Sequence, residues 1–231
     1  MAEAVSVIIP VRNGERFLGE AIATVAAQTH AVDEIVVVDD GSTDSTREIA
    51  LESGARYLTS AGRGSANARN TGAAAARSPL LAFLDHDDLW MPDKLERQLE
   101  RLAVAPDLGF VTTRVRVRVE PGATLPSWFR GDLTAWSGAI GSTVLVRAPV
   151  LNAVGGFNPA FKYADDYDWL LRTRDAGFSG DELATPLAEH RVHGMNHSHD
   201  REPVTAELMV VLRASMKRRV RQPDAADRAG A

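Results

Sequence analysis

The sequence predicts an α/β fold in which helices cover a mostly parallel central sheet. Two observations support this prediction. In roughly the first 100 residues, apolar runs typical of buried strands alternate four times with segments of helical periodicity. Each helical segment is also long enough to return the chain to the start of a parallel neighbour. The predicted strands are residues 5–10, 34–39, 55–59 and 80–84.

The helices between these strands are predicted from apolar residues at helical spacing and from signals at the helix ends. Ser45 and Glu48 predict a capping box at the start of the second helix, and Gly54 is expected to end it. Pro92 suits the first turn of the fourth helix. The predicted helices are residues 17–28, 45–54, 65–76 and 92–102.

The pattern changes after Pro106. Valine and arginine alternate near the end of a run at 110–119, which predicts a half-exposed, antiparallel strand with its arginines in solvent. Residues 121–136 show little periodicity and predict a loop over one end of the sheet. Its Trp128 and Trp136 could stack on a sugar ring, or form a small core cluster of their own. A further strand is predicted at 141–147, and helices at 163–176 and 205–219.

Composition limits the class of protein. The chain has 231 residues, of which 45% are hydrophobic and 25% charged, as in an ordinary globular protein. The net charge of −5 gives no reason to expect nucleic-acid binding, and the absence of cysteine excludes disulfides and thiolate metal sites. No apolar stretch approaches the roughly 18 residues of a membrane span. We therefore expect a cytoplasmic protein, at most peripheral to a membrane.

The last segment, 204–231, combines an amphipathic helix with a small, polar tail that is expected to be disordered. The helix ends in a basic cluster that includes Lys217 and Arg219. Such a cluster suits the negative end of the helix dipole. Contact with a membrane surface is the alternative interpretation.

Three carboxylates, Asp85, Asp87 and Asp88, follow the fourth predicted strand directly. Ligands of open α/β sheets bind at the carboxyl ends of the strands, so these side chains are expected at a ligand site. Like charges this close repel each other unless a cation offsets them, and clustered carboxylates suit Mg²⁺ or Mn²⁺. The alternative is an acidic turn in which Asp88 begins the next helix.

Several classes of nucleotide-binding enzyme are disfavoured, because their characteristic motifs are missing from the predicted α/β region. The first strand is not followed by G-x-G-x-x-G, and the chain contains no P-loop, which disfavours dehydrogenases and P-loop kinases. A sugar nucleotidyltransferase needs a glycine-rich basic loop after the first strand, and residues 11–14 are a poor match. An aspartyl-phosphate phosphatase would carry its D-x-D after the first strand rather than the fourth.

Seven segments occur in an order that points to one family. They are Val7–Pro10 with Asn13, Val38–Asp44, Ala68–Gly72, Phe83–Asp88, Gly155–Phe157, Asp165–Arg172, and Arg191–His193 with Asn196 and Ser198. In this order they resemble the family 2 inverting glycosyltransferases, which have the GT-A fold. The resemblance covers roughly residues 5–200. It implies a Rossmann-like nucleotide-sugar half at 1–106 and a mixed acceptor and catalytic-base half at 107–203.

The resemblance also implies roles for individual residues. Asp87 matches the metal ligand of the D-x-D motif, and His193 matches a histidine that reaches the metal or the diphosphate in some members. Asp166 matches the catalytic base of a Glu-Asp pair whose first member is Asp165 here, so the choice between the two acids stays open. Trp128 and Trp136 are acceptor-site candidates. The expected nucleotide-binding residues are Pro10, Val11, Asn13, Asp39, Arg69, Asp85 and His86.

The chemistry of such a reaction can be argued from the residues themselves. A nucleoside diphosphate leaves as a multiply charged anion, which a divalent cation would stabilise. A hydroxyl is a poor nucleophile at neutral pH, so a base must take its proton. Asp166 is expected to begin a helix, and a helix N-terminus favours the ionised carboxylate. The donor expected is a UDP-sugar, and the acceptor a saccharide, a lipid-linked saccharide or another hydroxyl compound.

Two hypotheses that assign the protein to a different functional class remain open. One is a protein that binds nucleotide sugars without turning them over. The other is a zinc protein built on the histidine cluster His190, His193, His197 and His199, whose spacing allows metal binding.

Overall fold

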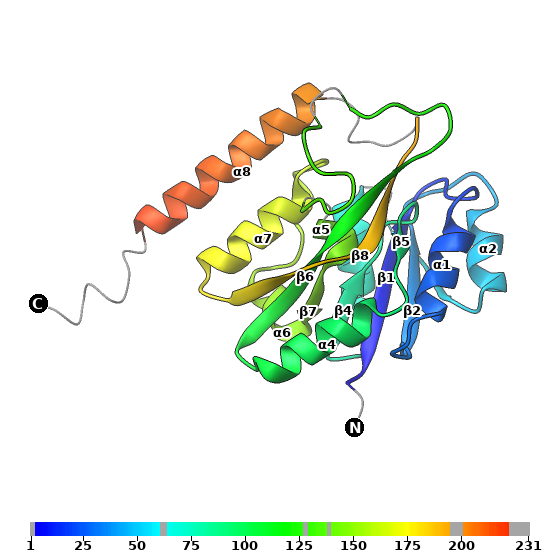
Figure 1. Cartoon of the computed structure of the whole chain (residues 1–231), viewed down its shortest axis with the longest axis horizontal. Coiled ribbons are helices and arrows are strands. Elements are labelled where there is room, and N and C mark those ends of the chain that lie inside the picture. The colour runs from blue at the N-terminus through cyan, green and yellow to red at the C-terminus, as the bar shows by residue number, and fades with distance from the viewer. Residues whose placement is uncertain (1–2, 61–63, 127–128, 138–139, 195–200, 222–231) are drawn as a thin grey trace, which may run out of the picture.

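The computed structural model describes residues 3–60, 64–126, 129–137, 140–194 and 201–221. In this part of the chain one eight-stranded sheet runs through the molecule (Figure 1). Across the sheet, the strands are β3 (Arg56–Thr59), β2 (Glu34–Asp39), β1 (Val5–Val11), β4 (Leu80–Phe83), β7 (Leu145–Arg147), β6 (Leu108–Val119), β8 (Ser179–Val192) and β5 (Leu89–Trp90). The helices are α1 (Leu18–Ala26), α2 (Thr46–Glu52), α3 (Ser65–Ala75), α4 (Lys94–Val104), α5 (Ile140–Thr143), α6 (Ala148–Ala153), α7 (Asp165–Asp175) and α8 (Arg201–Arg221).

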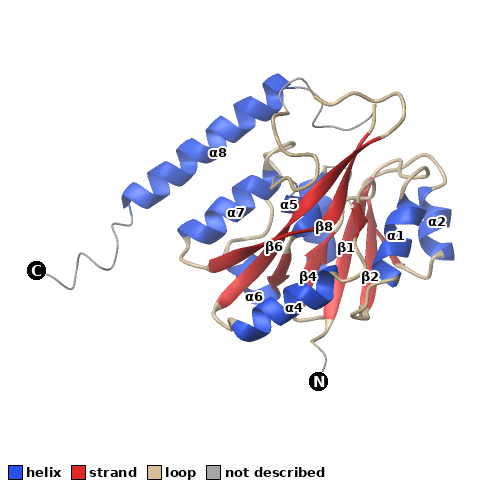
Figure 2. Cartoon of the chain, in the orientation of Figure 1, coloured by secondary structure: helices blue, strands red, loops and turns tan. Residues whose placement is uncertain are grey.

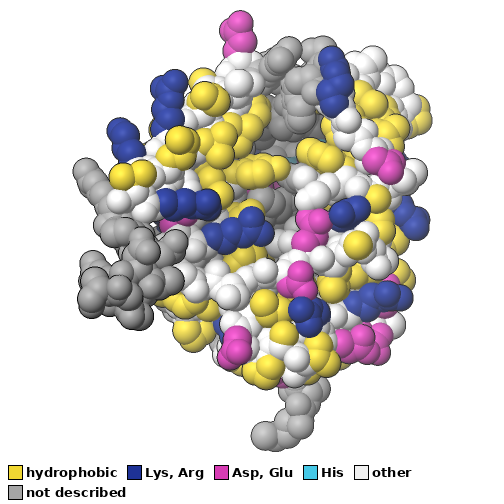
Figure 3. Space-filling view, turned by 60° about the vertical axis from the view of Figure 1, so that its left-hand side comes forward, with side chains coloured by type: hydrophobic (Ala, Val, Ile, Leu, Met, Phe, Trp, Pro, Cys, Tyr) yellow, Lys and Arg dark blue, Asp and Glu magenta, His cyan; other side chains and the backbone are white. Residues whose placement is uncertain are grey.

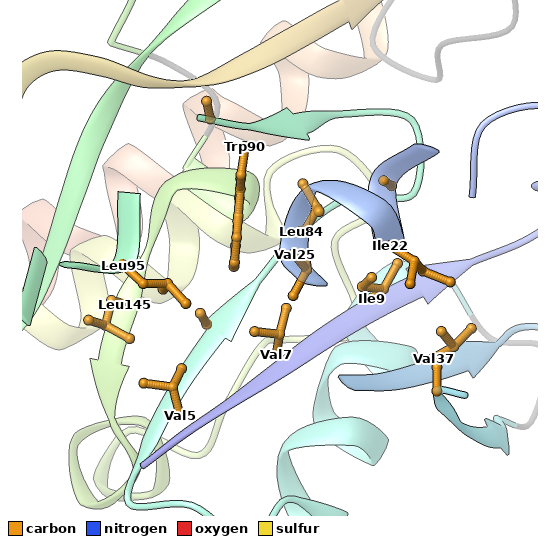
Figure 4. Close-up of a cluster of buried hydrophobic side chains, with 14 of the residues drawn as sticks. Val5, Val7, Ile9, Ile22, Val25, Val37, Leu84, Trp90, Leu95 and Leu145 are labelled. Atoms are coloured by element: carbon orange, nitrogen blue, oxygen red, sulfur yellow. The ribbon is translucent and has the colours of Figure 1, made fainter. Parts of the chain in front are cut away.

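The first half has the predicted parallel arrangement. β1 pairs in parallel with β2 on one side and with β4 on the other, and β2 pairs in parallel with β3. Alternate residues of a strand face opposite sides of the sheet, so β1 contributes to two cores. Val7 and Ile9 belong to the core that includes α1, and Ile8 to the core that includes α3. In Figure 4, Val7 and Ile9 lie in the first of these cores, with Val25 of α1 close to Val7.

The second half of the sheet is mixed, and here two predictions were wrong. The strand predicted at 110–119 is antiparallel to β7 and, at Val115, to Trp136, but it runs parallel to β8 for most of its length. β8 was not predicted, because this strand is polar and contains Pro186. The strand predicted at 141–147 is the helix α5 followed by the short strand β7, since a short apolar run fits either structure. Figure 2 shows the resulting mixture of strands and short helices.

Two predicted helix starts also differ from the structure. Ser45 precedes α2 but makes no side-chain capping bond. Instead the Asp44 carboxylate accepts hydrogen bonds from the backbone N–H and the hydroxyl of Thr46, and so replaces the predicted capping box. The fourth helix was predicted to have Pro92 in its first turn, but α4 begins at Lys94 with Asp93 as its N-cap, so Pro92 precedes it. The alternative, in which Asp88 begins this helix, is also excluded, because β5 follows Asp88.

The C-terminal helix α8 lies alongside α7, on the outside of the molecule (Figure 1). Val211 and Ser215 are buried on its inner side, whereas Met209, Leu212 and Met216 are exposed. Within the residues that the structure describes, no helix combines the length and the apolar character needed to cross a membrane. The expected disordered tail from Pro223 lies outside the described residues, as do Trp128, His197 and His199.

Candidate active site

A cavity of about 580 Å³ opens where β1 and β4 end. Its position agrees with the rule that ligands of α/β sheets bind at the carboxyl ends of the strands. Figure 3 views the molecule with the α8 side turned forward, where hydrophobic side chains surround a hollow. The predicted site residues that line the cavity are Pro10, Val11, Arg69, Asp85, His86, Asp87, Trp136, Asp165 and Asp166.

Two predicted nucleotide-binding residues, Asn13 and Asp39, lie outside the cavity lining. Asp39 accepts hydrogen bonds from the N–H and hydroxyl of Ser42 and from the hydroxyl of Tyr57, all within 2.8 Å. Asn13 accepts one from the N–H of Thr43. Both side chains therefore hold the loop after β2, and a role for either in nucleotide binding stays a prediction.

Their neighbours Asp40 and Arg12 line the cavity instead, and sequence reasoning missed both. The Asp40 carboxylate is buried and accepts bonds from the hydroxyl of Ser60 and, at 2.8 Å, from the N–H of Gly64 at the start of α3. Successive side chains of a strand point to opposite sides, so of two neighbouring acids at the end of a strand only one faces the cavity. Here that residue is Asp40 and not Asp39.

The acidic loop after β4 is held by two histidines from the end of β8. His193 Nε2 lies 2.9 Å from Asp87 Oδ2. His190 Nδ1 lies 3.0 Å from Asp88 Oδ1, which also accepts the N–H of Arg191 at 3.0 Å. These pairs depend on β8, the strand that the sequence did not reveal.

The electrostatics of the two aspartates follow from these contacts. Burial opposes ionisation of Asp87, but the His193 hydrogen bond and nearby imidazoles outweigh it and hold the pKa of Asp87 well below its usual value. Burial likewise opposes protonation of His190, but the charge and hydrogen bond of Asp88 prevail and raise the pKa of His190 to about 9. Asp87 is therefore an ionised carboxylate at neutral pH.

Ser142 of α5 connects this loop to the rest of the site. Its hydroxyl donates to Asp88 Oδ2 at 2.6 Å and accepts the N–H of Asp85 at 3.1 Å. The neighbouring N–H of Gly141 points the other way and donates to Asp166 Oδ2 at 3.3 Å. α5 therefore lies between the acidic loop and the acids of α7.

The predicted acid pair begins α7, where the two carboxylates have different surroundings. Asp165 is buried and accepts a hydrogen bond from Arg69 Nη1 at 2.5 Å, and Arg69 Nη2 donates to Asp85 at 2.7 Å. Burial favours neutral arginine, but the charges of Asp85 and Asp165 outweigh it and raise the pKa of Arg69 above its usual value. Asp165 is thus occupied by an ion pair.

Asp166 forms no ion pair with another of the described residues, and its Oδ1 accepts the N–H of Tyr167 at 2.7 Å. Burial and, secondly, the charge of Asp165 raise the pKa of Asp166 from 3.8 to about 7. The helix N-terminus was expected to favour ionisation, and here burial overrides that effect. A carboxyl group with a pKa near 7 suits proton transfer at neutral pH.

The outer part of the cavity is aromatic. Phe129 and Trp136 meet edge to face with ring centroids 5.2 Å apart, and Trp136 is fixed to β6 by reciprocal backbone bonds with Val115. Lys162 and Tyr163, which the sequence did not indicate, line the same region. Val204, Thr205 and Leu208 of α8 complete the wall.

A divalent cation fits the chemistry of the Asp87 and His193 side chains. Carboxylate oxygen and imidazole nitrogen are both ligands for Mn²⁺, and magnesium-type sites draw their other ligands from water and substrate phosphates. Among the described residues there is no group of three or more histidine and acidic side chains that could hold a metal alone. Of the predicted zinc cluster, His197 and His199 lie outside the described residues, while His190 and His193 each contact an aspartate.

Comparisons with known proteins agree with the predicted family. A sequence model described as glycosyl transferase family 2 matches residues 6–164, which is more than half of the chain. An uncharacterized glycosyltransferase of Rickettsia prowazekii (strain Madrid E) is 30% identical over 217 residues, covering 82% of this chain and 64% of that protein. An Escherichia coli protein, UDP-Glc:alpha-D-GlcNAc-diphosphoundecaprenol beta-1,3-glucosyltransferase, is 41% identical over 102 residues, covering 42% of this chain and 40% of that protein.

A solved structure confirms the predicted GT-A fold. The mannosyltransferase of Pyrobaculum calidifontis, in complex with GDP-Man and Mn²⁺, matches with a TM-score of 0.75 at 22% identity. The match covers 92% of this chain and 64% of that one. The present chain therefore spans less than two thirds of the length of each of these three proteins.

Proposed function

Because the chain belongs to glycosyl transferase family 2, we propose that it moves a sugar from a nucleoside-diphosphate sugar to an acceptor hydroxyl, with inversion. One observation carries this proposal. Asp87, an ionised carboxylate after β4, and Asp166, an acid with a pKa of about 7 on α7, line one cavity. Asp87 would supply a carboxylate for a divalent cation at the diphosphate end of the donor, and Asp166 a base for the acceptor hydroxyl.

For the donor, we favour a UDP-sugar. The Escherichia coli relative supports this choice because its name specifies UDP-Glc, whereas the Pyrobaculum calidifontis neighbour binds GDP-Man. Pro10, Val11 and Arg12 line the end of the cavity where the nucleotide would lie. Asp39 and Asp40 are both candidates to accept a hydrogen bond from the base.

Asp87 and His193 are the residues that would hold Mn²⁺ or Mg²⁺. Such an ion, when bound, offsets the negative charge of the departing diphosphate. Asp87 is suited to it because the carboxylate is already ionised at neutral pH. His193 keeps this carboxylate in place through its 2.9 Å contact.

Asp166, rather than Asp165, is the proposed base. Asp165 is buried and its carboxylate is engaged by Arg69, so an acceptor hydroxyl has little access to it, even though burial raises the pKa of Asp165 as well. Asp166 is half-buried and lines the cavity, where an acceptor hydroxyl could approach it. The two neighbouring acids therefore have separate tasks: one holds the helix to α3, and the other takes the proton.

The acceptor is expected to be a saccharide, free or lipid-linked. Aromatic rings such as Trp136 and Phe129 are suited to contact the apolar face of a sugar ring. The Escherichia coli relative supports a lipid-linked acceptor, since its name specifies GlcNAc-diphosphoundecaprenol.

A direct test combines binding and turnover. Purified protein is screened by thermal shift against UDP, GDP and ADP with and without Mn²⁺, because a ligand of the native state raises the apparent stability. UDP-sugars are then incubated with lipid-linked and free saccharides, and product is measured by mass spectrometry. Asp39→Asn and Asp40→Asn are compared to identify the acid that contacts the base. Binding of UDP-sugars without transfer to any acceptor would favour a non-catalytic binding protein.

A further inference from the structure

Glu207 of α8 binds the backbone immediately before α7. Its carboxylate accepts the N–H of Lys162 at 3.0 Å, of Tyr163 at 2.7 Å and of Ala164 at 3.0 Å. These three consecutive amides lead directly into Asp165, where α7 begins. Glu207 lies beyond residue 164, the last residue that the family model matches.

The N-cap position of α7 has no side-chain acceptor of its own. The N-cap residue is Ala164, which has no side-chain oxygen and makes no side-chain capping bond. Serine, threonine, aspartate or asparagine usually fills this position. Of the acids in the first turn, Asp165 pairs with Arg69 and Asp168 with Arg172, and Asp166 accepts a helix amide, that of Tyr167. Glu207 binds the three amides that precede this turn, so α8 fixes the segment that leads into α7.

A second contact holds α8 at the opposite end of α7. Asp175, the last residue of α7, accepts bonds from the hydroxyl of Ser215 at 3.0 Å and from Arg218 and Arg219 at 2.8 Å. Both Glu207 and Asp175 attach α8 to α7, but only Glu207 contacts the segment next to Asp166. The two attachments can therefore be removed separately.

We propose that Glu207 is a positioning residue for Asp166, the proposed base; this inference rests on the proposed function. By fixing three successive amides, Glu207 sets the place from which the Asp165–Asp166 pair enters the cavity. Reacting groups must be held within a fraction of an ångström for efficient transfer, and a displacement of about 1 Å can cost roughly a hundredfold in rate. Donor binding depends on the β1 and β4 end of the cavity and is left unchanged.

The test compares Glu207→Ala with Asp175→Ala in the full chain. Glu207→Ala should lower kcat by roughly ten- to a hundredfold, with the KM for donor unchanged. Asp175→Ala should lower the melting temperature about as much as Glu207→Ala does. It should change kcat less than threefold. Glu207→Gln keeps one carbonyl oxygen that can accept two of the bonds, so it should recover part of the lost kcat and guards against misfolding of the alanine variant.

Hydrogen exchange provides a readout that does not depend on activity. Residues 162–167 should exchange faster in Glu207→Ala than in wild type, and at the wild-type rate in Asp175→Ala. If kcat falls equally in both variants, or if Glu207→Ala leaves kcat or the exchange of 162–167 unchanged, the positioning role is wrong. If the wild-type chain transfers no sugar, the proposed function fails instead, and the exchange comparison still decides whether Glu207 holds this segment.

Discussion

Arg69 of α3 and Asp165 of α7 form a buried ion pair with 2.5 Å between Nη1 and Oδ2, although 96 positions separate them in the sequence. Each side chain is only 6% exposed. The other arm of the guanidinium donates to Asp85, so Arg69 joins the acidic loop after β4 to the start of α7. The parallel first half of the sheet and the part of the chain that carries α7 are thereby held together at one buried cation.

The first prediction concerns this pair. Arg69→Met should lower the free energy of unfolding by about 3–5 kcal/mol, because it leaves buried carboxylates without their counter-charge. Chemical denaturation measures the change. Arg97→Met is the control: Arg97 lies just as close to Asp93, at 2.5 Å, but both side chains are exposed. Its loss should stay below about 1 kcal/mol. Similar losses in both variants would mean that burial does not distinguish the pairs.

The second prediction concerns the proposed base. Asp166→Asn cannot take a proton, so kcat should fall by roughly 10²- to 10⁴-fold while UDP affinity stays near wild type. In wild type the carboxyl must be ionised to act, and its pKa is about 7. The kcat should therefore rise about tenfold per pH unit below pH 7 and level off above it. If Asp165→Asn abolishes transfer and Asp166→Asn is nearly silent, the base has been assigned to the wrong acid.

The third prediction concerns stability at the same residue. A pKa raised from 3.8 to about 7 means that folding binds the proton more tightly, so ionisation of Asp166 destabilises the folded chain. This loss grows as the pH rises from about 4 to 7 and is complete above 7. Asp166→Asn should therefore melt at a higher temperature than wild type at pH 8, and the advantage should shrink toward pH 4. An advantage that does not vary with pH would contradict the shifted pKa.

The fourth prediction concerns the metal. Asp87→Ala removes the proposed carboxylate ligand, so the extra thermal shift that Mn²⁺ gives with UDP should disappear. Asp88→Ala is the comparison. Because Asp88 is buried and accepts bonds from Ser142, His190 and Arg191, its loss should lower the melting temperature without ligand more than Asp87→Ala does. Full Mn²⁺-dependent stabilisation in Asp87→Ala would exclude Asp87 as a metal ligand.

The fifth prediction concerns the acceptor. Trp136→Ala should raise the KM for a saccharide acceptor by roughly three- to tenfold, since an aromatic contact contributes about 1 kcal/mol. The affinity for UDP should not change, because Trp136 is attached to β6 rather than to the β1 residues proposed for the nucleotide. Trp136→Phe keeps an aromatic ring and should lose less. An unchanged acceptor KM in the alanine variant would place acceptor recognition elsewhere.

The sequence predicted the first half of the fold well because its signals are local. Buried parallel strands such as β1 and β4 are continuous apolar runs, and helices separate them at regular intervals. β8 was not predicted because one side of it is polar and Pro186 interrupts it, although it carries His190 and leads directly into His193. A pairing between distant strands leaves no periodic trace in either segment.

Site residues that belong to a short sequence motif could be predicted. Contacts between side chains from distant segments could not. Asp87, Asp165 and Asp166 line the cavity as expected. Asp40 rather than Asp39 lines the cavity because successive side chains of a strand point to opposite sides. The sequence alone does not tell which of the two faces the cavity. The contact of Glu207 with Ala164 joins residues 43 positions apart and has no signature in either segment.

α8 contributes to the cavity in two ways, since Leu208 and Thr205 line its outer wall while Glu207 grips the backbone before Asp165. If α8 were exchanged between relatives, the cavity wall formed by Thr205 and Leu208 and the proposed positioning residue Glu207 would be replaced together. On this proposal, changes in α8 that alter the acceptor preference would also alter kcat. New acceptor preferences that leave the speed intact should arise on the other wall, around Trp136 and Phe129.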